Sequence, residues 1–332
     1  MSNLLDVTDL AVSFRTRSGL IRAVDGVSFS IAEREILGIV GESGSGKSLT
    51  VLAILDLIND PNVVIAGSIR FKGTELIGQK PGVLRRLRGG AIAMIFQDPM
   101  TALTPVFTIG AQIAEQIRIH TELSRHAARS RAVDLLDAVG LPDPARAAAR
   151  YPQELSGGQR QRAVIAMALS CNPALLLADE PTTALDVTVQ AQILELIRKL
   201  RDDFNSAVIL ITHNLGVVAE TADRVAVMYS GRIVESASTT ALFADPHHPY
   251  TWGLLGSMPA LDGIRRPRLA TIQGLPPALN RRPPGCAFSP RCAFVRPACI
   301  NARPPLTGTE HQVACIIPAP ERATARTQAL AA

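Results

Sequence analysis

Up to about Pro246, hydrophobic positions divide the chain into alternating strands and helices. The stretches 4–14 and 22–31 alternate and are rich in β-branched residues, so we expect strands there. Later apolar runs predict buried strands, with helical spacing between them. We place these buried strands at 35–40, 91–96, 174–180 and 207–213. The alternation predicts an α/β fold, a mostly parallel sheet covered by helices.

The predicted helices fall into separate segments and one long block. Helical spacing predicts helices from the end of GESGSGKS to about Ile58, at 187–204 and at 215–221. From about Pro99 to Ser170 the spacing is mostly helical, with a break at LPDP (141–144), and this block interrupts the sheet, so we expect a helical insertion there. A short strand at 67–72 and a closing hairpin at 224–236, with Ser-Gly at its turn, complete this part.

From Pro246 the composition changes, because prolines become dense. We expect a separate appendage here, not a continuation of the sheet, and a loose tail at TARTQALAA. This gives two predicted domains, residues 1–250 and 251–332, the first with its helical insertion at about 99–170.

Composition narrows the class of protein. The 332 residues are 47% hydrophobic and carry a formal charge of +5, with 4% aromatic residues. Such a chain can build a packed core, and its few aromatics give little support to single-strand base stacking. No uninterrupted apolar run approaches the ~20 residues of a membrane helix, and the start MSNLLDVTDL lacks the basic flank and apolar core of a signal peptide. We therefore expect a cytosolic protein that reaches a membrane only through membrane-spanning partners.

The stretch GESGSGKS matches the pattern G-x-x-x-x-G-K-[ST] with Gly41, Gly46, Lys47 and Ser48. Glycines let backbone N–H groups turn inward around phosphates, and the positive end of the following helix faces the same anion. Lys47 is expected to reach the β- and γ-phosphates, and the Ser48 hydroxyl to bind Mg²⁺. Because an expected strand precedes the loop and an expected helix follows it, the pattern predicts a nucleotide site.

Two acids end the apolar run LLLADE at 175–180. Asp179 is expected to hold Mg²⁺, and Glu180 to orient and polarise the attacking water. A strand that ends in Asp-Glu is common by itself, so this interpretation depends on the phosphate loop that precedes it.

The stretch LSGGQ, Leu155–Gln159, lies directly before a helical run. Its glycines, with Ser156 at the expected helix start, form a second anion-binding helix terminus. One nucleotide does not need two such cradles from the same chain. We therefore expect each chain to lend this turn to the ATP of a partner.

In this order the motifs resemble those of ABC-type ATPases, over roughly residues 3–260. Gln97 follows a strand, in the position of the family's Q-loop, TALD at 183–186 resembles the D-loop, and His213 resembles the switch histidine. Phe14 stands where the family places an aromatic residue that stacks on adenine, although the insertion RTRSG blurs that match. The resemblance implies a P-loop NTPase fold with a RecA-like core, an antiparallel β subdomain and an inserted helical subdomain.

The resemblance also implies two subunits that close face to face around two ATP molecules. It makes Glu180, His213 and Gln97 catalytic: Glu180 orients water, His213 contacts the γ-phosphate, and Gln97 senses metal and nucleotide. Ser48, Gln97 and Asp179 become the expected Mg²⁺ ligands. The residues expected to contact ATP, in cis or in trans, are Phe14, Gly41, Ser43, Gly44, Ser45, Gly46, Lys47, Ser48, Leu49, Gln97, Ser156, Gly158, Gln159, Asp179 and Asp186.

Three further stretches, 96–115, 248–259 and 274–294, resemble the oligopeptide, dipeptide and nickel importers within this family. The resemblance implies an ATPase coupled to peptide import, with nickel, haem or glycosides as alternative substrates. It implies as partners a second, different ATPase subunit, two transmembrane permease subunits and an extracytoplasmic substrate-binding protein. The location would be the cytoplasmic face of the inner or plasma membrane, and no nucleic-acid partner is expected.

Four of the five cysteines crowd into the appendage with the spacing C-x5-C-x6-C-x15-C, as Cys286, Cys292, Cys299 and Cys315. A cytosolic location argues against disulfides, and four thiolates suit either tetrahedral zinc or an iron–sulfur cluster. The spacing lacks the C-x2-C pairs of zinc ribbons, and some members of the resembled branch carry a [4Fe–4S] cluster at these four positions. An iron–sulfur cluster is our preferred hypothesis for the four cysteines, with zinc or metal-free packing as alternatives. Cys171 is expected to be a buried core thiol.

Two other classes of function remain alternatives. A soluble ABC ATPase acting on nucleic acid or ribosomes usually carries two cassettes in one chain or a long coiled coil, and this chain has neither. An iron–sulfur regulator with a vestigial ATPase is the third hypothesis, and the intact Glu180 and His213 argue against it.

Overall fold

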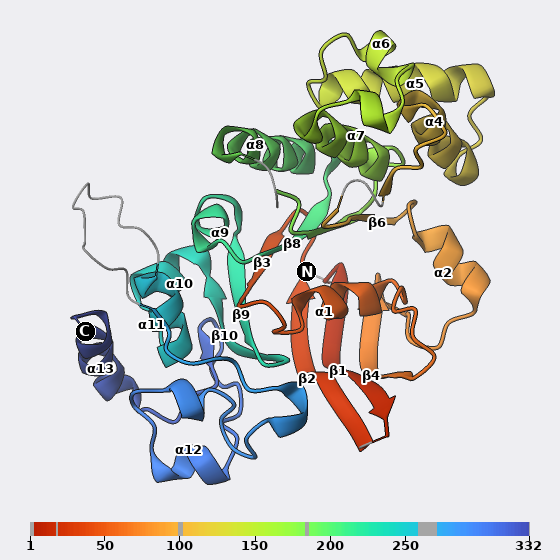
Figure 1. Cartoon of the computed structure of the whole chain (residues 1–332). Helices are drawn as coiled ribbons and strands as arrows, with labels where there is room; N and C mark the ends of the chain where they lie inside the picture. Colours follow the sequence, from red (N-terminus) through yellow and green to blue (C-terminus); the bar gives the residue numbers. More distant parts are fainter. Residues whose placement is uncertain (1–2, 18, 99–101, 183–185, 258–270, 332) are drawn as a thin grey trace. The chain divides into compact units, whose positions relative to one another are not determined.

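The computed structural model of the chain describes residues 3–17, 19–98, 102–182, 186–257 and 271–331 (Figure 1). These residues divide into two units, and each is described by itself below. The first unit comprises residues 1–5, 31–36 and 71–211. The second unit comprises residues 6–30, 37–70 and 212–332.

The first unit contains three parallel strands in the order β8-β7-β6: Ala207–Thr212, Leu175–Asp179 and Ile92–Ile95. In the register of the ladder, Leu176 pairs with Ala93 on one side and Val208 on the other. Every residue of β7 and β8 is buried. Strands covered on both faces are apolar throughout, which is why their sequences show no alternation. The predicted parallel arrangement is confirmed for these strands.

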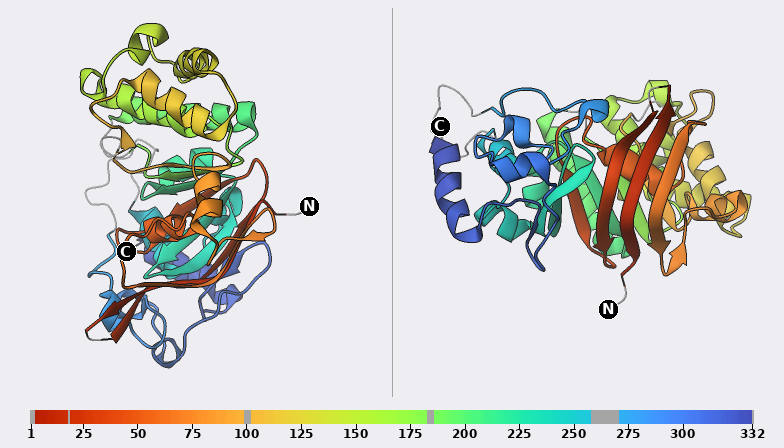
Figure 2. Two further views of the ribbon diagram at one scale, coloured as in Figure 1. Left: turned by 90° about the vertical axis from the view of Figure 1, so that its right-hand side faces the viewer. Right: turned by 90° about the horizontal axis from the view of Figure 1, so that it is seen from below.

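Helices make up most of the rest of the first unit. Within the predicted insertion 99–170, α4 packs on α5 and α5 packs on α7 (Figure 2). Ser124 begins α5 by accepting a hydrogen bond from the Ala127 N–H, as a helix cap does. The helical insertion is confirmed in its described part. The α-helices whose bounds are described in this unit are α2 (Pro81–Leu87), α4 (Ile109–His120), α5 (Arg125–Ala138), α6 (Pro144–Ala148), α7 (Gly157–Leu169) and α8 (Val187–Phe204).

The second unit contains two groups of strands. Three long strands lie side by side in the order β2-β1-β4, seen in the right-hand view of Figure 2: Gly19–Ile31, Leu5–Thr16 and Val63–Phe71. The other group begins with β3 (Ile36–Val40), which is parallel to β9 (Arg224–Tyr229). Strand β10 (Arg232–Ser238) then returns antiparallel to β9 through Ser230 and Gly231, whose φ angles of 47° and 79° suit a tight hairpin. The predicted hairpin is confirmed.

The C-terminal segment corrects two expectations. Strand β11 (Gln312–Val313) pairs with β10, so the appendage does extend the sheet, contrary to the prediction. A two-residue strand is too short to leave a pattern in the sequence, and the free edge of β10 supplies its partner groups. Helix α13 (Ala319–Ala331) replaces the expected loose tail and contacts α11 (Pro249–Gly256). Alanine and other strong helix formers fill α13, which explains why it is helical.

A buried carboxylate connects β2, β10 and the C-terminal segment. Asp25 is 3% exposed, and its Oδ2 accepts hydrogen bonds from Arg232, Arg282 and Arg303 at 2.9–3.0 Å. Arg22 reaches Oδ1 at 3.3 Å. Burial by itself would raise the pKa of Asp25, but the arginines outweigh it and the pKa lies below its ordinary value. Charged hydrogen bonds therefore hold the C-terminal segment here, because it has little regular structure of its own.

None of the helices in the described residues is both long and apolar enough to cross a bilayer.

Candidate nucleotide site and cysteine cluster

The phosphate loop, residues 41–48, connects β3 to α1 (Lys47–Ile54) in the second unit. Gly41 has a φ of 152°, and a Cβ there would lie 2.1 Å from the carbonyl oxygen of Met228. Gly46, with φ 100°, precedes the first residue of α1. Both positions therefore require glycine, and the loop can pass close to β9 and turn directly into the helix. The helix is shorter than predicted, since it ends at Ile54 instead of about Ile58.

Lys47 lies folded over this loop. Its side chain is buried, and its Nζ donates hydrogen bonds to the carbonyl oxygens of Gly41 at 2.8 Å and Glu42 at 2.9 Å. The positive charge thus sits inside the turn and at the amino terminus of α1, where the helix dipole also favours an anion. Ser43, Gly44, Ser45, Ser48 and Leu49 belong to the same loop and helix start.

The two acids end β7 in the first unit. Asp179 is the last residue of the strand and is buried. Glu180 follows in the left-handed region with φ 47°, and its N–H donates to the Ile211 carbonyl of β8 at 3.0 Å. A non-glycine residue in that region stores strain of about 1–3 kcal/mol, which is common at functional positions. The strand end therefore turns Glu180 out of the line of β7.

Gln97 and Glu180 come together, although 83 positions separate them. Gln97 lies just past the end of β6, and its Nε2 donates a hydrogen bond to Glu180 Oε2 at 3.1 Å. Because β6 and β7 are parallel neighbours, their carboxyl ends meet at the same edge of the sheet. The structure thus places two of the three predicted catalytic residues in contact.

The LSGGQ turn begins α7, as predicted. Ser156 is the N-cap residue, and its hydroxyl accepts a hydrogen bond from the Gln159 N–H at 3.3 Å, while Gln159 Oε1 accepts from the Ser156 N–H at 3.1 Å. This reciprocal pair fixes the first turn of the helix. Ser156 is exposed, Gly158 and Gln159 are half-buried, and the turn is accessible on its own unit.

The remaining predicted nucleotide contacts lie on separate elements. His213 follows β8 and is exposed, and Phe14 is half-buried on β1; both belong to the second unit. Asp186 caps α8 by accepting from the Val189 N–H at 2.9 Å. The other residues of the TALD stretch, 183–185, lie outside the described residues.

The four predicted cysteines of the C-terminal segment line one small cavity in the second unit, with the rings of Phe288 and Phe294 beside them. All four thiols are free of disulfides. The backbone N–H of Arg296 donates to the sulfur of Cys299 at 3.4 Å. The other three sulfurs also receive backbone N–H groups, each from the residue two positions later in the chain. The four residues are Cys286, Cys292, Cys299 and Cys315.

Burial raises the pKa of three of these thiols. The pKa of Cys292 rises to about 12, and those of Cys286 and Cys315 also lie above the ordinary value, with desolvation as the main cause and the neighbouring sulfurs adding to it. Backbone N–H groups act in the opposite direction. The cavity therefore favours neutral thiols unless a cation is present to stabilise thiolates.

Cys171, the fifth cysteine, is half-buried instead of fully buried as expected. Its sulfur lies 3.8 Å from the Gln116 carbonyl oxygen, and burial raises its pKa.

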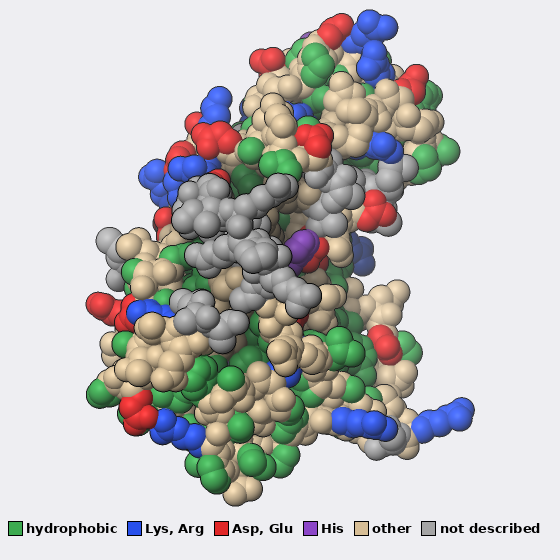
Figure 3. Space-filling model, turned by 60° about the vertical axis from the view of Figure 1, so that its left-hand side comes forward, with side chains coloured by type: hydrophobic (Ala, Val, Ile, Leu, Met, Phe, Trp, Pro, Cys, Tyr) green, Lys and Arg blue, Asp and Glu red, His purple; other side chains and the backbone are tan. Residues whose placement is uncertain are grey.

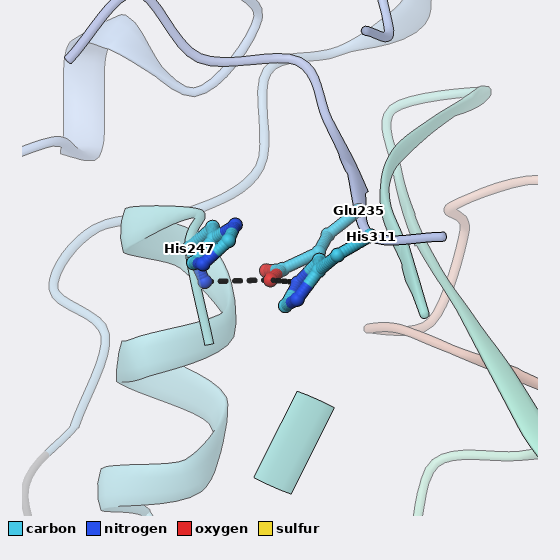
Figure 4. A group of neighbouring side chains, drawn as sticks. All are labelled: Glu235, His247 and His311. Carbon is cyan, nitrogen blue, oxygen red and sulfur yellow. Dashed lines mark hydrogen bonds and ion pairs between the residues drawn. The ribbon is translucent and has the colours of Figure 1, made fainter. Parts of the chain in front are cut away.

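A buried acid that the sequence did not single out lies under the C-terminal segment. Glu235 on β10 is fully buried and accepts hydrogen bonds from the backbone N–H groups of His247 and His248 at 2.6 and 2.9 Å and contacts His311 Nε2 at 2.7 Å (Figure 4). Its carboxylate and the two imidazoles of His247 and His311 lie within 4.8 Å of one another. The two rings stack at 3.8 Å with 9° between their planes. Parallel rings cannot direct their in-plane lone pairs at one ion, so we interpret this group as an anchor for β11 and α11.

On the face drawn in Figure 3, acidic and basic side chains are interspersed over the helices of the first unit. The helical part of this face therefore does not present the extended surface of a single charge sign that nucleic-acid binding requires.

Two protein families match the chain. The family described as "ABC transporter" matches residues 24–183, and "Oligopeptide/dipeptide transporter, C-terminal region" matches residues 234–299. Among curated relatives, a putative peptide import ATP-binding protein of Brucella abortus is 53% identical over 301 residues, which is 91% of this chain and 90% of that protein. A Brucella melitensis protein of the same description is 51% identical over 326 residues, 94% of this chain and 96% of that protein.

The oligopeptide transport ATP-binding protein OppD of Mycobacterium tuberculosis is 52% identical over 319 residues, but this chain spans only 52% of its length. Among solved structures, a dimeric ATP-binding cassette bound to ADP and phosphate superimposes with a TM-score of 0.64 at 27% identity, covering 71% of this chain and 98% of that one. A cassette from Clostridium perfringens, part of an ABC transporter complex, gives 0.62 at 25% identity, covering 74% and 92%.

Proposed function

The chain belongs to the ABC transporter family, in the branch with an oligopeptide/dipeptide-type C-terminal region, and we propose that it is the ATP-hydrolysing subunit of a peptide importer. The full-length match to peptide import ATP-binding proteins carries the proposal. The predicted P-loop NTPase fold is confirmed by the solved cassettes that superimpose on it. We assign the cassette to residues 1–250 and the family-specific extension to residues 251–332.

We assign binding of the ATP phosphates to the loop at 41–48. Its glycines let the backbone wrap the phosphates, and Lys47 and the start of α1 supply positive charge. Ser48 and Asp179 offer the oxygen ligands that Mg²⁺ prefers, and the ion would neutralise charge on the phosphates during hydrolysis. His213 and Phe14 are assigned to the γ-phosphate and the adenine by resemblance alone.

Glu180 is proposed to orient the water that attacks the γ-phosphorus. Its carboxylate is held by Gln97, so the amide can fix the direction in which the carboxylate accepts a hydrogen bond. Because phosphoryl transfer depends mainly on positioning and charge, this orientation would carry much of the rate. Movement of Gln97 would then be transmitted to Glu180 directly.

The accessible LSGGQ turn is assigned to the nucleotide of a second ATPase subunit. Ser156 starts a helix whose first N–H groups can face an anion, and the solved relative bound to ADP and phosphate is a dimer. We propose a different, homologous chain as that partner. Two permease subunits would hold the pair at the cytoplasmic face of the membrane, and an extracytoplasmic binding protein would deliver the peptide.

The cysteine cluster is proposed to hold a [4Fe–4S] cluster. Four free thiols line one cavity, and each receives a backbone N–H, the kind of hydrogen bond that tunes such clusters. The cysteine spacing in the sequence, which lacks the C-x2-C pairs of zinc ribbons, supports a cluster over zinc. A bound cluster would supply the cation that buried thiolates need.

Anaerobic purification of the chain tests the cluster. We expect a broad absorption band near ~400 nm and roughly four irons per chain, both lost in Cys292→Ser but kept in Cys171→Ser. A colourless, iron-free sample would end the proposal, and stoichiometric zinc would replace it with a zinc site.

Affinity purification of the chain from its native membrane tests the transport role. We expect hydrophobic permease subunits to co-purify and MgATP hydrolysis by the complex to rise when peptide-loaded binding protein is added to proteoliposomes. Co-purification with nucleic acid or ribosomes in place of membrane subunits would contradict the proposal. Stimulation by nickel, haem or a glycoside instead of peptide would keep the ATPase role and change the substrate.

A further inference from the structure

Glu42, the second residue of the phosphate loop, is held at each of its polar groups. Its backbone N–H donates to the hydroxyl of Tyr250 at 2.8 Å, and its carbonyl oxygen accepts from Lys47 at 2.9 Å. Its carboxylate is bound by Arg291, with 2.6 Å to Oε2 and 2.9 Å to Oε1. Two of these three partners belong to the C-terminal part of the chain, more than 200 positions away.

Arg291 is itself fixed from several sides. Its side chain is 4% exposed, and it donates to the carbonyl oxygens of Gln273 at 3.0 Å and Ile272 at 3.3 Å. The rings of Tyr229 and Phe288 lie 5.8 and 6.0 Å from its guanidinium. A guanidinium held in this way cannot rotate freely, so it presents two donors to Glu42 in a set direction.

The position of Arg291 in the chain connects this ion pair to the cysteine cluster. It ends the short turn η3 (Ser289–Arg291) and directly precedes Cys292 of the cysteine cluster. Residues 276–279 of the same segment also line a cavity of about 330 Å³ together with residues 42–45 of the phosphate loop. The segment that carries the cysteines therefore borders the loop and holds it through one two-pronged contact.

We propose that Arg291 is a positioning residue for the phosphate loop, because it fixes Glu42. This contact makes the nucleotide affinity of the loop depend on the folding of the cysteine segment. The proposal rests on the nucleotide binding proposed above. Arg291 does not touch the phosphates; it sets the geometry from which Lys47 and the loop amides do so. Loss of the pair leaves the Glu42 carboxylate without its partner beside the loop, where its charge also opposes phosphate binding.

Nucleotide binding by single variants of the full chain tests the contact. With N-methylanthraniloyl-ATP as the probe, we expect Arg291→Ala to raise Kd about tenfold, since pair interactions of about 1.4 kcal/mol correspond to that factor. Arg291→Lys should raise Kd by only about threefold, because lysine keeps the charge but not the two-pronged geometry. Arg296→Ala is the matched control: it removes an exposed arginine of the same segment that pairs with Glu321, and Kd should change less than about twofold.

A double-mutant cycle and the kinetics separate positioning from simple misfolding. Glu42→Ala and Arg291→Ala should each raise the Kd for the ATP analogue. The Kd of the double variant should exceed that of either single variant by no more than about twofold. In the assembled transporter Arg291→Ala should raise KM for ATP while kcat stays within about threefold, whereas misfolding would lower kcat with the active fraction. Additive effects in the cycle, or unchanged Kd in folded Arg291→Ala, would overturn the proposal.

Coupling to the cysteine segment is tested in the same assay. Cys292→Ala should raise Kd about fivefold in the wild-type background and less than about twofold in Arg291→Ala, since the connection is already broken there. Equal effects in both backgrounds would contradict the coupling. Failure of the wild-type chain itself to bind the probe would instead refute the proposed function.

Discussion

The phosphate loop and the cysteine segment, residues 271–317, are built by opposite means, although both lie in the second unit. The loop is a short turn between β3, which is fully buried, and α1, so apolar burial and glycine geometry shape it. The cysteine segment has only short turns, α12 (Pro297–Asn301) and β11, and it is held by Arg282, Arg291 and Arg303. The turn of the first region follows from its own glycines, with Glu42 as the residue held by distant partners, whereas the second region depends throughout on side chains that reach distant parts of the chain.

Because glycine geometry and apolar burial shape the loop, we expect changes in its polar side chains to affect nucleotide binding more than the stability of the fold. Lys47→Ala should raise Kd for the ATP analogue by about 100-fold, because a charged hydrogen bond of about 2–3 kcal/mol to phosphate is lost. The free energy of unfolding in urea should fall by less than about 1.5 kcal/mol. Lys199→Ala, an exposed lysine on α8, serves as the control and should change neither value. A large loss of stability with normal nucleotide binding in Lys47→Ala would mean that Lys47 stabilises the fold and does not bind the phosphates.

Changes at the ion pairs that hold the cysteine segment should instead affect the stability of the fold more than nucleotide binding. Asp25→Ala leaves the buried guanidinium of Arg282 without its counter-charge, and we expect the free energy of unfolding to drop by about 3–5 kcal/mol. Urea unfolding followed by fluorescence of Trp252, the single tryptophan, which contacts Phe294 of the cysteine segment, is the measurement. Glu220→Ala removes an exposed acid on α9 (Leu215–Thr221) and should cost less than about 0.5 kcal/mol. A loss below about 1 kcal/mol in Asp25→Ala would mean that the arginines do not need this carboxylate.

The same carboxylate gives a pH dependence with a defined sign. The arginines hold the native pKa of Asp25 below the ordinary 3.8, so its contribution to stability is fully present above that pH. The contribution is lost as the pH falls through the native pKa, where protonation breaks the ion pairs. The difference in unfolding free energy between wild type and Asp25→Asn should therefore be constant near neutral pH and shrink below about pH 4. A difference that grew on acidification would contradict the assigned direction.

The smallest expected effect concerns the end of the chain. Arg326 on α13 pairs with Asp245, whose side chain is 62% exposed. Arg326→Ala should cost less than about 1 kcal/mol, because exposed ion pairs contribute little. Loss of more than about 2 kcal/mol in urea unfolding would mean that α13 is part of the core of the C-terminal region and not a weakly held addition.

Elements whose pattern is local could be predicted from the sequence. Uniform apolar runs indicated β7 and β8, and the Ser-Gly pair indicated the hairpin between β9 and β10. Ser156 indicated the start of α7 because a capping residue acts on the next three positions. In each case the interactions that decide the structure lie within a few residues of one another.

Elements that depend on distant partners could not be predicted. Strand β11 exists because β10 offers an edge, and two residues carry no period. The contact between Glu42 and Arg291 spans 249 positions, and neither residue type indicates the other. Gln97 was assigned by resemblance and Glu180 from the end of its apolar strand, but their mutual hydrogen bond follows only from the pairing of β6 with β7. The loose tail was a wrong prediction because it followed the general looseness of chain ends, whereas these residues form α13, which contacts α11.

Turnover of Glu180→Gln in the purified transporter tests the central assignment most directly. Glutamine keeps the size of the side chain but removes the carboxylate that is proposed to orient water. We expect MgATP hydrolysis to fall by about 10²–10³-fold while the Kd for the ATP analogue stays within about threefold of wild type. Hydrolysis within tenfold of wild type at unchanged binding would contradict this assignment.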